Sequence, residues 1–298
     1  MSNCIKRALQ TSIIHIERFK EFGPNRNTII GPSKIEIPDF PHQKTVWSRP
    51  SLLFNNSGEL MYCGDEICWV LKDNEWKFHS QFLKQRHNKV MVQMSNGTYV
   101  FGYTYGDSEN TSEFLLNNSC KWQAGPSIPY DKRVSMYSAL AVSKNEFVLI
   151  GGSTTLSDIG TILKFDINTS KWTVVGNLKH PRSECSVAIF NDKIIVCNGR
   201  DANKVLKSTE IIPFKRISGE KEIEFLPIRQ GGDTRLARCH GGIGVVQDGD
   251  SQKLIRFGNG VPTQEWNDET ETWRISTKIE SYNMSDTGFL SKGTHYFH

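Results

Sequence analysis

Residues 138–182 contain short runs of apolar residues separated by polar turns. The first two runs, at 139–142 and 147–150, consist of strand-forming residues and flank a polar turn, which predicts a β-hairpin. Gly151 and Gly152 follow where the chain must leave the sheet with dihedral angles that glycine adopts most easily. Two more strands are predicted at 161–166 and from Trp172 onward. The segment therefore predicts one four-stranded antiparallel sheet.

A single sheet of this length leaves both faces largely exposed to water, so copies of it are expected elsewhere in the chain. Tryptophans that can begin a fourth strand stand at Trp76, Trp122, Trp172 and Trp273, with spacings of 46, 50 and 101 residues. The last spacing corresponds to two repeats, and Phe225 fits the position without a tryptophan. Each tryptophan is preceded by a large apolar residue seven positions earlier, at Trp69, Leu115, Phe165 and Trp266.

An arginine ahead of each predicted first strand is a further marker of the repeat. These arginines are Arg49, Arg86, Arg133, Arg182 and Arg238. Glycine closes each predicted second strand, although only residues 151–152 form a pair. Markers that stay in phase over five repeats predict a β-propeller, in which four-stranded blades surround a central axis.

The repeats predict an all-β, six-bladed propeller that uses the chain of 298 residues as one domain. Five blades are predicted at about 48–85, 86–130, 131–180, 181–235 and 236–285. The sixth blade is expected to combine residues 1–47 with residues 286–298. Its third and fourth strands are predicted at 9–18 and 34–39, and its first and second at 287–290 and 294–297. This pairing of the two chain ends would close the ring without an open sheet edge.

The residues Gly151, Gly152, Trp172, Pro181 and Arg182 resemble the kelch repeat, and the likeness covers nearly the whole chain. The other predicted blades lack the diglycine, the fourth lacks the tryptophan, and the tyrosine usual after the glycines is absent. The resemblance implies a protein-binding propeller. Kelch propellers often follow BTB and BACK domains as substrate receptors of cullin ubiquitin ligases, while others bind actin or act as scaffolds. No BTB or BACK helical segment is recognised here, so a ligase role requires an adaptor from another chain.

Charge and hydropathy narrow the expected partners. The formal net charge of +4 is small, and the densest basic cluster, at 84–89, holds three basic residues plus His87. A nucleic-acid-binding protein more often shows a concentrated basic stripe with interleaved aromatic residues. The sequence contains no run of about 18 apolar residues, the length needed to span a membrane. The first residues lack the apolar segment of a signal peptide. We expect neither a nucleic-acid nor a membrane partner.

The cysteines and asparagines bear on the cellular compartment. Seven cysteines without a repeated spacing favour free buried thiols in a reducing compartment, and hence a cytoplasmic protein. Most of the Asn-X-Ser/Thr triplets lie at predicted hairpin turns, where asparagine is favoured for its dihedral tolerance. A secreted, glycosylated propeller stays open as the alternative. The triplets begin at Asn55, Asn96, Asn110, Asn117, Asn168 and Asn283.

Catalysis is the main alternative to binding. The repeats are also similar to those of galactose oxidase, which carries copper on two tyrosines, two histidines and a tyrosine–cysteine crosslink. Copper requires imidazole ligands that converge on one face, but the eight histidines recur at no common blade position. His87 and His240 lie within two residues of marker arginines, which leaves a weak metal hypothesis. Sialidase-type, nucleophile-elbow and phosphate-loop motifs are absent, so we expect no cofactor and no enzymatic activity.

Binding at one end of the propeller axis is the function that the pattern favours. Segments entering the first strands and loops joining the second and third strands gather at this end. The marker arginines belong to these segments, and arginine offers paired hydrogen bonds to a carboxylate, which suits an acidic peptide. The alternative is that each arginine bonds to backbone carbonyls of its own blade.

Loop residues add aromatic and basic anchors of the kind common in protein interfaces. We therefore predict a non-enzymatic interaction module, or scaffold, that recognises a peptide or loop of another protein, such as a ubiquitin-ligase substrate or a cytoskeletal protein. The predicted contact residues are Arg49, Arg86, Arg133, Arg182, Arg238, Tyr103, Tyr105 and Arg200.

Overall fold

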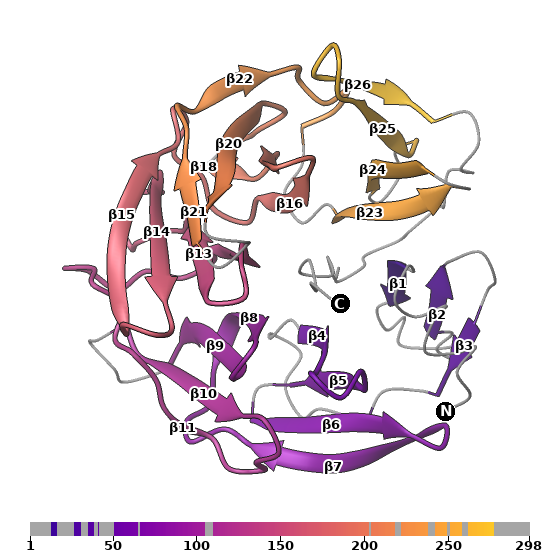
Figure 1. Cartoon of the computed structure of the whole chain (residues 1–298), viewed down its shortest axis with the longest axis vertical. Helices are drawn as coiled ribbons and strands as arrows, with labels where there is room; N and C mark the ends of the chain where they lie inside the picture. Colours follow the sequence, from indigo (N-terminus) through magenta and orange to yellow (C-terminus); the bar gives the residue numbers. More distant parts are fainter. Residues whose placement is uncertain are drawn as a thin grey trace.

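The computed structural model describes most of the chain between residues 51 and 276 and short segments before it. The described ranges are 13–16, 27–30, 35–38, 41, 51–64, 66–104, 110–202, 204–217, 222–237, 242–248, 251–257 and 262–276. The regular structure in these ranges is all β-strand (Figure 1). Within these ranges no helix is long and apolar enough to cross a bilayer.

Five blades follow one another around the axis in chain order. Blade one consists of β4 (Ser51–Phe54), β5 (Leu60–Cys63), β6 (Ile67–Lys72) and β7 (Glu75–Gln81). Blade two consists of β8 (His87–Met94), β9 (Gly97–Tyr103), β10 (Ser112–Leu116) and β11 (Gln123–Ala124). Blade three consists of β12 (Ser138–Ala141), β13 (Glu146–Ile150), β14 (Thr161–Asp166) and β15 (Lys171–Asn177).

Blades four and five keep the same antiparallel order, and blade four carries additions. Its strands are β16 (Ser186–Phe190), β17 (Lys193–Cys197), β20 (Thr209–Ile217) and β21 (Glu222–Phe225). The added strands are the hairpin β18 (Arg200–Asp201) and β19 (Lys204–Val205), and β22 (Arg229–Gly231), which pairs with β20. Blade five consists of β23 (Gly242–Asp248), β24 (Ser251–Phe257), β25 (Gln264–Asn267) and β26 (Thr272–Ile275).

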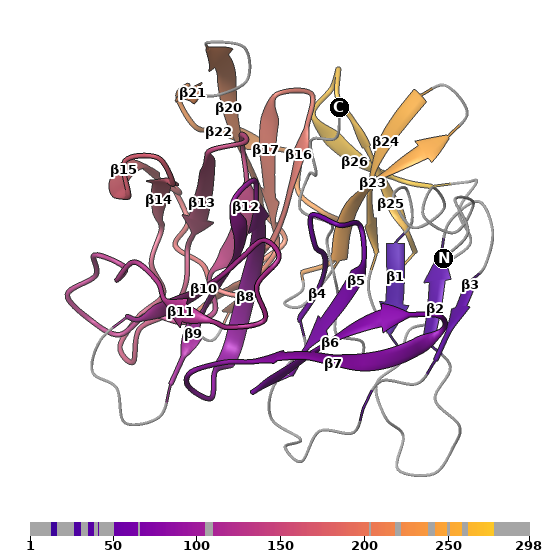
Figure 2. The same cartoon turned by 60° about the horizontal axis from the view of Figure 1, so that its bottom comes forward.

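The described residues thus form an all-β propeller with five blades, whereas six were predicted. The N-terminal strands make a three-stranded sheet of β1 (Ile13–Ile16), β2 (Asn27–Ile30) and β3 (Ile35–Ile37). This sheet lies between blades one and five (Figures 1 and 2). The predicted C-terminal strands at 287–290 and 294–297 lie outside the described residues.

The prediction that the strands at 9–18 and 34–39 are neighbours is wrong. The strand β2 lies between them, and both β1 and β3 pair with β2 in antiparallel register. The segment Thr28–Ile30 explains this difference, because β-branched residues favour the extended backbone of a strand.

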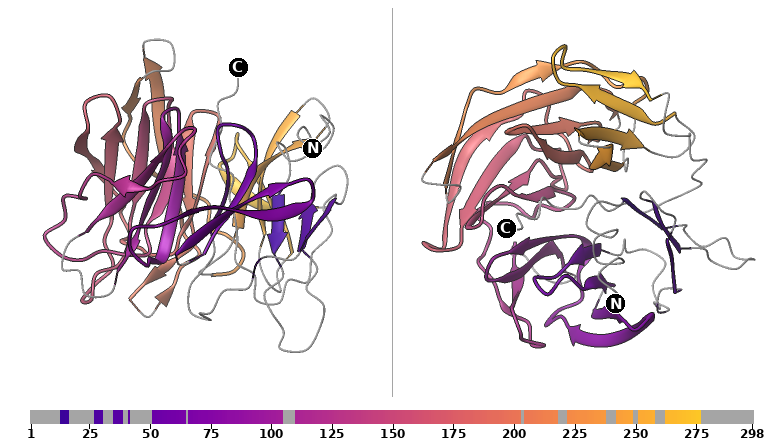
Figure 3. Two further views of the ribbon diagram at one scale, coloured as in Figure 1. Left: turned by 90° about the horizontal axis from the view of Figure 1, so that it is seen from below. Right: turned by 45° about the vertical axis from the view of Figure 1, so that its right-hand side comes forward.

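The hydrophobic core lies between neighbouring blades. One cluster joins Leu140 and Val148 of blade three to Val187 and Ile212 of blade four, and similar clusters join the other consecutive pairs. The inner strands β4, β8, β12, β16 and β23 contact one another in this order. They run along the axis in the side view of Figure 3. Each blade therefore depends on its neighbours to bury its faces, as expected for stacked repeats.

Three of the four marker tryptophans donate a hydrogen bond to the unit before their own blade. Trp122 donates its Nε1 hydrogen to Ser80 of blade one at 3.0 Å, and Trp273 donates to Thr209 of blade four at 3.0 Å. In the same manner Trp76 of blade one donates to the backbone carbonyl of Pro38 at 3.0 Å. Buried indole N–H groups need such acceptors, so the tryptophans fix how the units stack.

The two apolar markers seven residues apart do not face each other in every blade. Phe165 pairs with Trp172 in blade three, and Trp266 pairs with Trp273 in blade five. In blade one Trp76 pairs with Leu71 instead, because a two-residue turn joins β6 to β7.

The prediction that Phe225 takes the place of the missing tryptophan in blade four is wrong. Phe225 pairs with Phe214, four residues after Glu210, whereas the partners of Trp172 and Trp273 lie two residues after Leu163 and Gln264. The longer hairpin of blade four therefore moves Phe225 out of the tryptophan register.

Candidate functional site

One end of the propeller gathers the segments predicted to bind a partner. The segments leading into first strands are 82–86, 125–137, 178–185 and 226–237, and the long loops joining second to third strands are 151–160 and 198–208. We call this the connection end, and the opposite one the hairpin end. In blade three Ser135 and Ser153 exchange backbone hydrogen bonds of 2.9 and 2.7 Å, and in blade four Ser183 and Arg200 do so at 2.9 Å. Loops and connections therefore form one bonded layer.

Arg182 lies in this layer, but its side chain is 0% exposed. Its Nη1 donates to the backbone carbonyls of Asn198 and Ser208, both at 3.0 Å. Its Nη2 lies 2.7 Å from Oε1 of Glu210, whose side chain is 1% exposed. Glu210 also accepts the backbone N–H groups of Lys179 and His180. The pair therefore fastens the connection before β16 to the start of β20.

Arg86 repeats this arrangement in blade two. Its Nε donates to Oε1 of Glu113 at 2.9 Å, and its Nη1 donates to the carbonyl of Thr111 at 2.9 Å. Glu113 also accepts the backbone N–H groups of Leu83 and Lys84. Arg86 is 1% exposed, so neither it nor Arg182 presents its guanidinium to a partner in this structure. For these two arginines the alternative expectation holds, since each bonds to groups of its own blade.

The glutamates that hold these arginines share a sequence signal of their own. Glu113 and Glu210 each stand two residues after a Thr or Ser, and 27 and 28 residues after their arginine. In blade five Gln264 takes the equivalent register position, where it accepts Nη1 of Arg256 from β24 at 2.8 Å. Arg256 was not among the markers, because it lies within a strand rather than ahead of one.

Blade three differs because Leu163 stands where blades two, four and five have Glu or Gln. A leucine side chain cannot accept a hydrogen bond or balance a charge, so a buried arginine beside it would be strongly unfavourable. Arg133 instead lies with its guanidinium carbon 4.0 Å from the ring centroid of Tyr103, a cation–π contact with β9 of blade two. Tyr103 in turn lies 6.1 Å from the His87 ring. Arg133 and Tyr103 are both partly exposed.

Of the other predicted contact residues, only Arg200 is described. It begins the β18–β19 hairpin at the connection end, and its side chain is partly exposed. Arg49, Arg238 and Tyr105 lie outside the described residues, so their roles stay predictions.

Two loop residues that were not predicted from the sequence also shape this end. Asn198 is 0% exposed and donates from Nδ2 to the carbonyl of Leu206 and to Thr234 Oγ1, both at 3.1 Å. Asp158 accepts the backbone N–H of Ala202 at 2.5 Å, which joins the loop of blade three to that of blade four. The Asn198–Gly199 dipeptide after β17 is a turn signal that could have pointed to the first of these.

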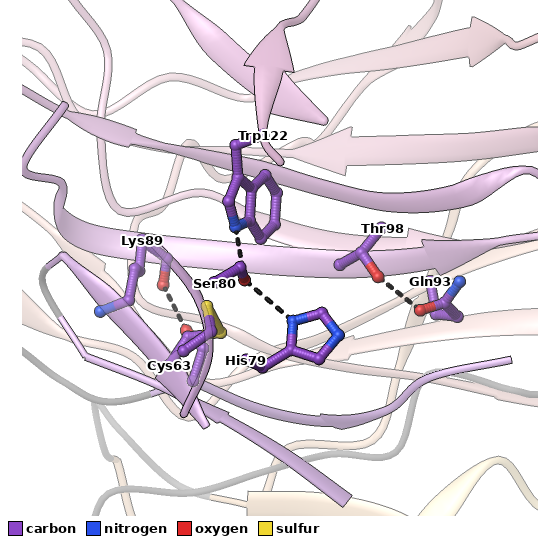
Figure 4. Close-up of a disulfide and its surroundings, with 9 residues drawn as sticks. Cys63, His79, Ser80, Lys89, Gln93, Thr98 and Trp122 are labelled. Atoms are coloured by element: carbon purple, nitrogen blue, oxygen red, sulfur yellow. Dashed lines mark hydrogen bonds between the residues drawn. A yellow bond between two sulfur atoms is a disulfide. The ribbon is translucent and has the colours of Figure 1, made fainter. Parts of the chain in front are cut away.

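The expectation of free thiols is wrong for Cys63 and Cys68, which form a disulfide between directly opposed positions of β5 and β6. Figure 4 shows it near Ser80, which links Trp122 to His79 Nδ1. Among the described cysteines, Cys120 is free and exposed, whereas two are free and buried, Cys185 and Cys197.

Burial governs the pKa values of several groups in the propeller. It raises the pKa of the Cys197 thiol to about 12 and also raises that of Cys185, so both thiols stay protonated and unreactive at neutral pH. Desolvation lowers the pKa of His79, which favours its neutral form.

Within the described residues no group of three or more His, Cys, Asp or Glu side chains is placed to hold a metal ion.

The blades around one axis and the bonded layer at their connection end define a β-propeller. No protein-family model matches the chain. Among solved structures, that of YjhT superposes with a TM-score of 0.62 over 81% of this chain and 86% of that chain. Its sequence identity of 12% means that the likeness concerns the fold alone.

Two curated proteins resemble parts of the sequence. Kelch-like protein terF from Aspergillus terreus is 26% identical over 140 residues, or 43% of this chain, and spermatocyte protein spe-26 from Caenorhabditis elegans is 26% identical over 165 residues, or 49% of this chain. The matches span 30% and 27% of those proteins, less than a third of their length. Together with the propeller, they confirm the predicted resemblance to kelch-repeat proteins.

Proposed function

We propose that the chain is a non-enzymatic interaction module that recognises a peptide or loop of another protein at the connection end. The observation that carries the proposal is that the marker arginines differ in their burial and in their partners. Arg86 and Arg182 are held inside their blades by glutamates, whereas Arg133 reaches the surface layer and lies over Tyr103. A partly exposed guanidinium held by an aromatic ring is preorganised to bind a carboxylate.

Charge reversal at Arg133 tests this function once affinity capture has supplied a partner. Arg133→Glu is expected to weaken binding of that partner by about tenfold or more, while the melting temperature stays unchanged. Arg182 is not a suitable second position, because it is buried with Glu210 and its substitution would lower the stability of the fold. The exposed Lys144 at the hairpin end of blade three is the matched control, and Lys144→Glu should leave binding unchanged. Unchanged binding by Arg133→Glu, with the fold intact, would contradict the proposal.

The partner class follows from the relatives only as a proposal. A role as substrate receptor or scaffold is consistent with the resemblance to kelch-like protein terF. Because the chain matches less than a third of that protein, an adaptor that links it to a ligase would come from outside the matched segment. Metal analysis of the purified protein separates this function from a copper oxidase, since stoichiometric copper together with oxidase turnover would overturn it.

We also propose that the chain is a single domain with six units, in which residues 286–298 pair with the N-terminal sheet. The bond from Trp76 to Pro38 supports this arrangement, because Trp122 and Trp273 make the same kind of bond to the preceding blade. Deletion of residues 286–298 is expected to lower the melting temperature of the whole propeller. An unchanged melting temperature would contradict closure by the two chain ends.

We propose a cytoplasmic location, which the free buried thiols of Cys185 and Cys197 support. The disulfide of Cys63 and Cys68 favours the alternative, a secreted protein, which glycan mass shifts at Asn96 or Asn168 would reveal. One triplet is unsuited to glycosylation in the folded protein. Asn110 is 7% exposed, its Nδ2 donates to the carbonyl of Lys132 at 2.8 Å, and its Oδ1 accepts the N–H of Val134 at 2.7 Å. The folded structure therefore uses this asparagine as a brace between blades two and three.

A further inference from the structure

Three large apolar side chains are exposed at the connection end of blades three to five. Leu156 in the loop 151–160 is 78% exposed, Val205 in β19 is 41% exposed, and Leu236 in the segment before β23 is 46% exposed. Single exposed apolar residues are common, but groups of them on one surface mark interaction sites. We call these three residues and the loops that carry them the apolar platform.

Hydrogen bonds join the three parts of the platform. The bond from Ala202 N to Asp158 connects the loop that carries Leu156 to the loop that carries Val205. Asn198 connects the second loop to the third segment, because its Nδ2 donates to the carbonyls of Leu206 and Leu236 at 3.1 and 3.4 Å. Its Oδ1 accepts Nε of the buried Arg256 at 2.6 Å. Loops held in this way lose little conformational freedom when a partner binds.

The loops differ in length around the ring. Three residues separate β5 from β6 in blade one, where the disulfide of Cys63 and Cys68 closes the turn. Ten residues separate β13 from β14, and eleven separate β17 from β20. The longer loops offer contact surface on the side of blades three and four.

Basic side chains adjoin the apolar ones. Lys204 precedes Val205 and Arg235 precedes Leu236, and like Lys179 and Arg200 they make no ion pair with a described residue. The nearby carboxylates are Asp158, Asp201 and Glu184, and Asp158 already accepts the amide of Ala202. Lys207 and Asp233 pair with each other at 3.5 Å. On these segments the four basic side chains outnumber the three carboxylates, and the residues directly before Val205 and Leu236 are both basic. This arrangement favours a partner that carries carboxylates beside its apolar side chain.

We infer that the apolar platform is the docking surface for an acidic protein segment that carries a bulky apolar side chain. The apolar side chain packs on Leu156, Val205 and Leu236, and the carboxylates meet Lys204, Arg235 and Arg200. This inference rests on the proposed function and deepens it, since it names the side of the connection end and the chemistry of the partner.

Selection from a phage-displayed library of random peptides on the purified protein tests this chemistry without a known partner. Peptides rich in Asp and Glu with at least one Leu, Ile or Phe are expected to be enriched. Their affinity, measured by fluorescence polarisation, should fall by about tenfold or more in Lys204→Glu/Arg235→Glu and again in Leu156→Ser. Failure to enrich any peptide, or enrichment of peptides without acidic residues, overturns the inference.

Matched controls keep the two proposals apart. Lys144→Glu/Lys171→Glu changes the charge by the same amount at exposed positions of the hairpin end, and Val174→Ser removes an exposed apolar side chain from the outer strand β15. Neither should change peptide affinity by more than about twofold. If the peptides lose affinity in Arg133→Glu but not in the platform variants, the platform is wrong while the proposed function stands. If the controls weaken binding as much as the platform variants, the platform is also wrong.

Discussion

At the scale of single residues, the buried Arg–Glu pairs show that a residue of the third strand determines whether the marker arginine is buried. Arg182 and Glu210 are both almost fully buried, so each charge depends on the other and on nearby backbone groups. Loss of one partner leaves an uncompensated charge in the blade. In blade three Leu163 takes the position of Glu210, and Arg133 is partly exposed and lies over Tyr103.

Arg182→Ala is therefore expected to lower the free energy of unfolding by about 3 to 5 kcal/mol, because Glu210 would stay buried without its cation. Urea denaturation followed by tryptophan fluorescence measures this loss. The double variant Arg182→Met/Glu210→Met should recover most of it, since it removes both charges while retaining apolar volume. A double variant as unstable as the single one would show that the charge pair is not the cause.

The tryptophans offer a second comparison between equivalent residues. Trp122→Phe loses the bond to Ser80, whereas Nε1 of Trp172 is buried and has no hydrogen-bond partner among the described residues. Trp122→Phe is expected to cost about 1 kcal/mol more than Trp172→Phe in thermal unfolding measurements. Equal losses would mean that the indole bond does not stabilise the contact between blades one and two.

At the scale of elements, two different devices hold the loops that join second to third strands. In blade one the disulfide of Cys63 and Cys68 closes a short turn. In blade three Gly151, with φ of 65°, allows the chain to approach the connection before β16, since a Cβ atom there would lie 2.2 Å from the carbonyl oxygen of Arg182. The short turn and the longer loop therefore require different residues at equivalent places.

Reduction of the disulfide, or the double variant Cys63→Ser/Cys68→Ser, is expected to lower the free energy of unfolding by about 2 kcal/mol, as chain entropy predicts for so short a loop. Alkylation and mass spectrometry establish the redox state, and thermal unfolding measures the loss. The exposed Cys120 provides the control, since Cys120→Ser should have no effect. Full alkylation of Cys63 and Cys68 without reductant would contradict the disulfide.

At the scale of the whole molecule, stability is shared between blades. The core clusters join each described blade to the next, and the tryptophan bonds cross the same boundaries. No described blade buries its apolar faces by itself. Neighbouring repeats therefore stabilise one another, as in other stacked architectures.

A peptide of residues 134–180, which contains blade three alone, is accordingly expected to be unfolded in water. Circular dichroism and hydrogen exchange measure this directly. The core residues Phe147 and Leu163 pack on residues of blade two, and Val148 and Ile162 on residues of blade four, so the isolated sheet would expose both faces. A cooperative thermal transition in the peptide would contradict this account.

The sequence alone determined the strands and their repeat. Alternation of apolar runs with polar turns depends on local propensities, which explains why β14 was predicted at the bounds that the structure has. The short strands β2, β18 and β19 were missed, because so few residues carry little periodic signal. The binding end was predicted because antiparallel strands bring the segments before the first strands and the loops after the second strands to the same end of the axis.

Only the tertiary structure decided which predicted contact residues face outward. Arg86, Arg133 and Arg182 are indistinguishable as markers ahead of a strand, and what separates them is a residue about 30 positions later in a third strand. The joining of Asp158 to Ala202, and the pairing of Cys63 with Cys68, likewise depend on which positions the folded sheets bring together. Local propensity sets the strand, but burial of a charge depends on neighbours that are distant in the chain.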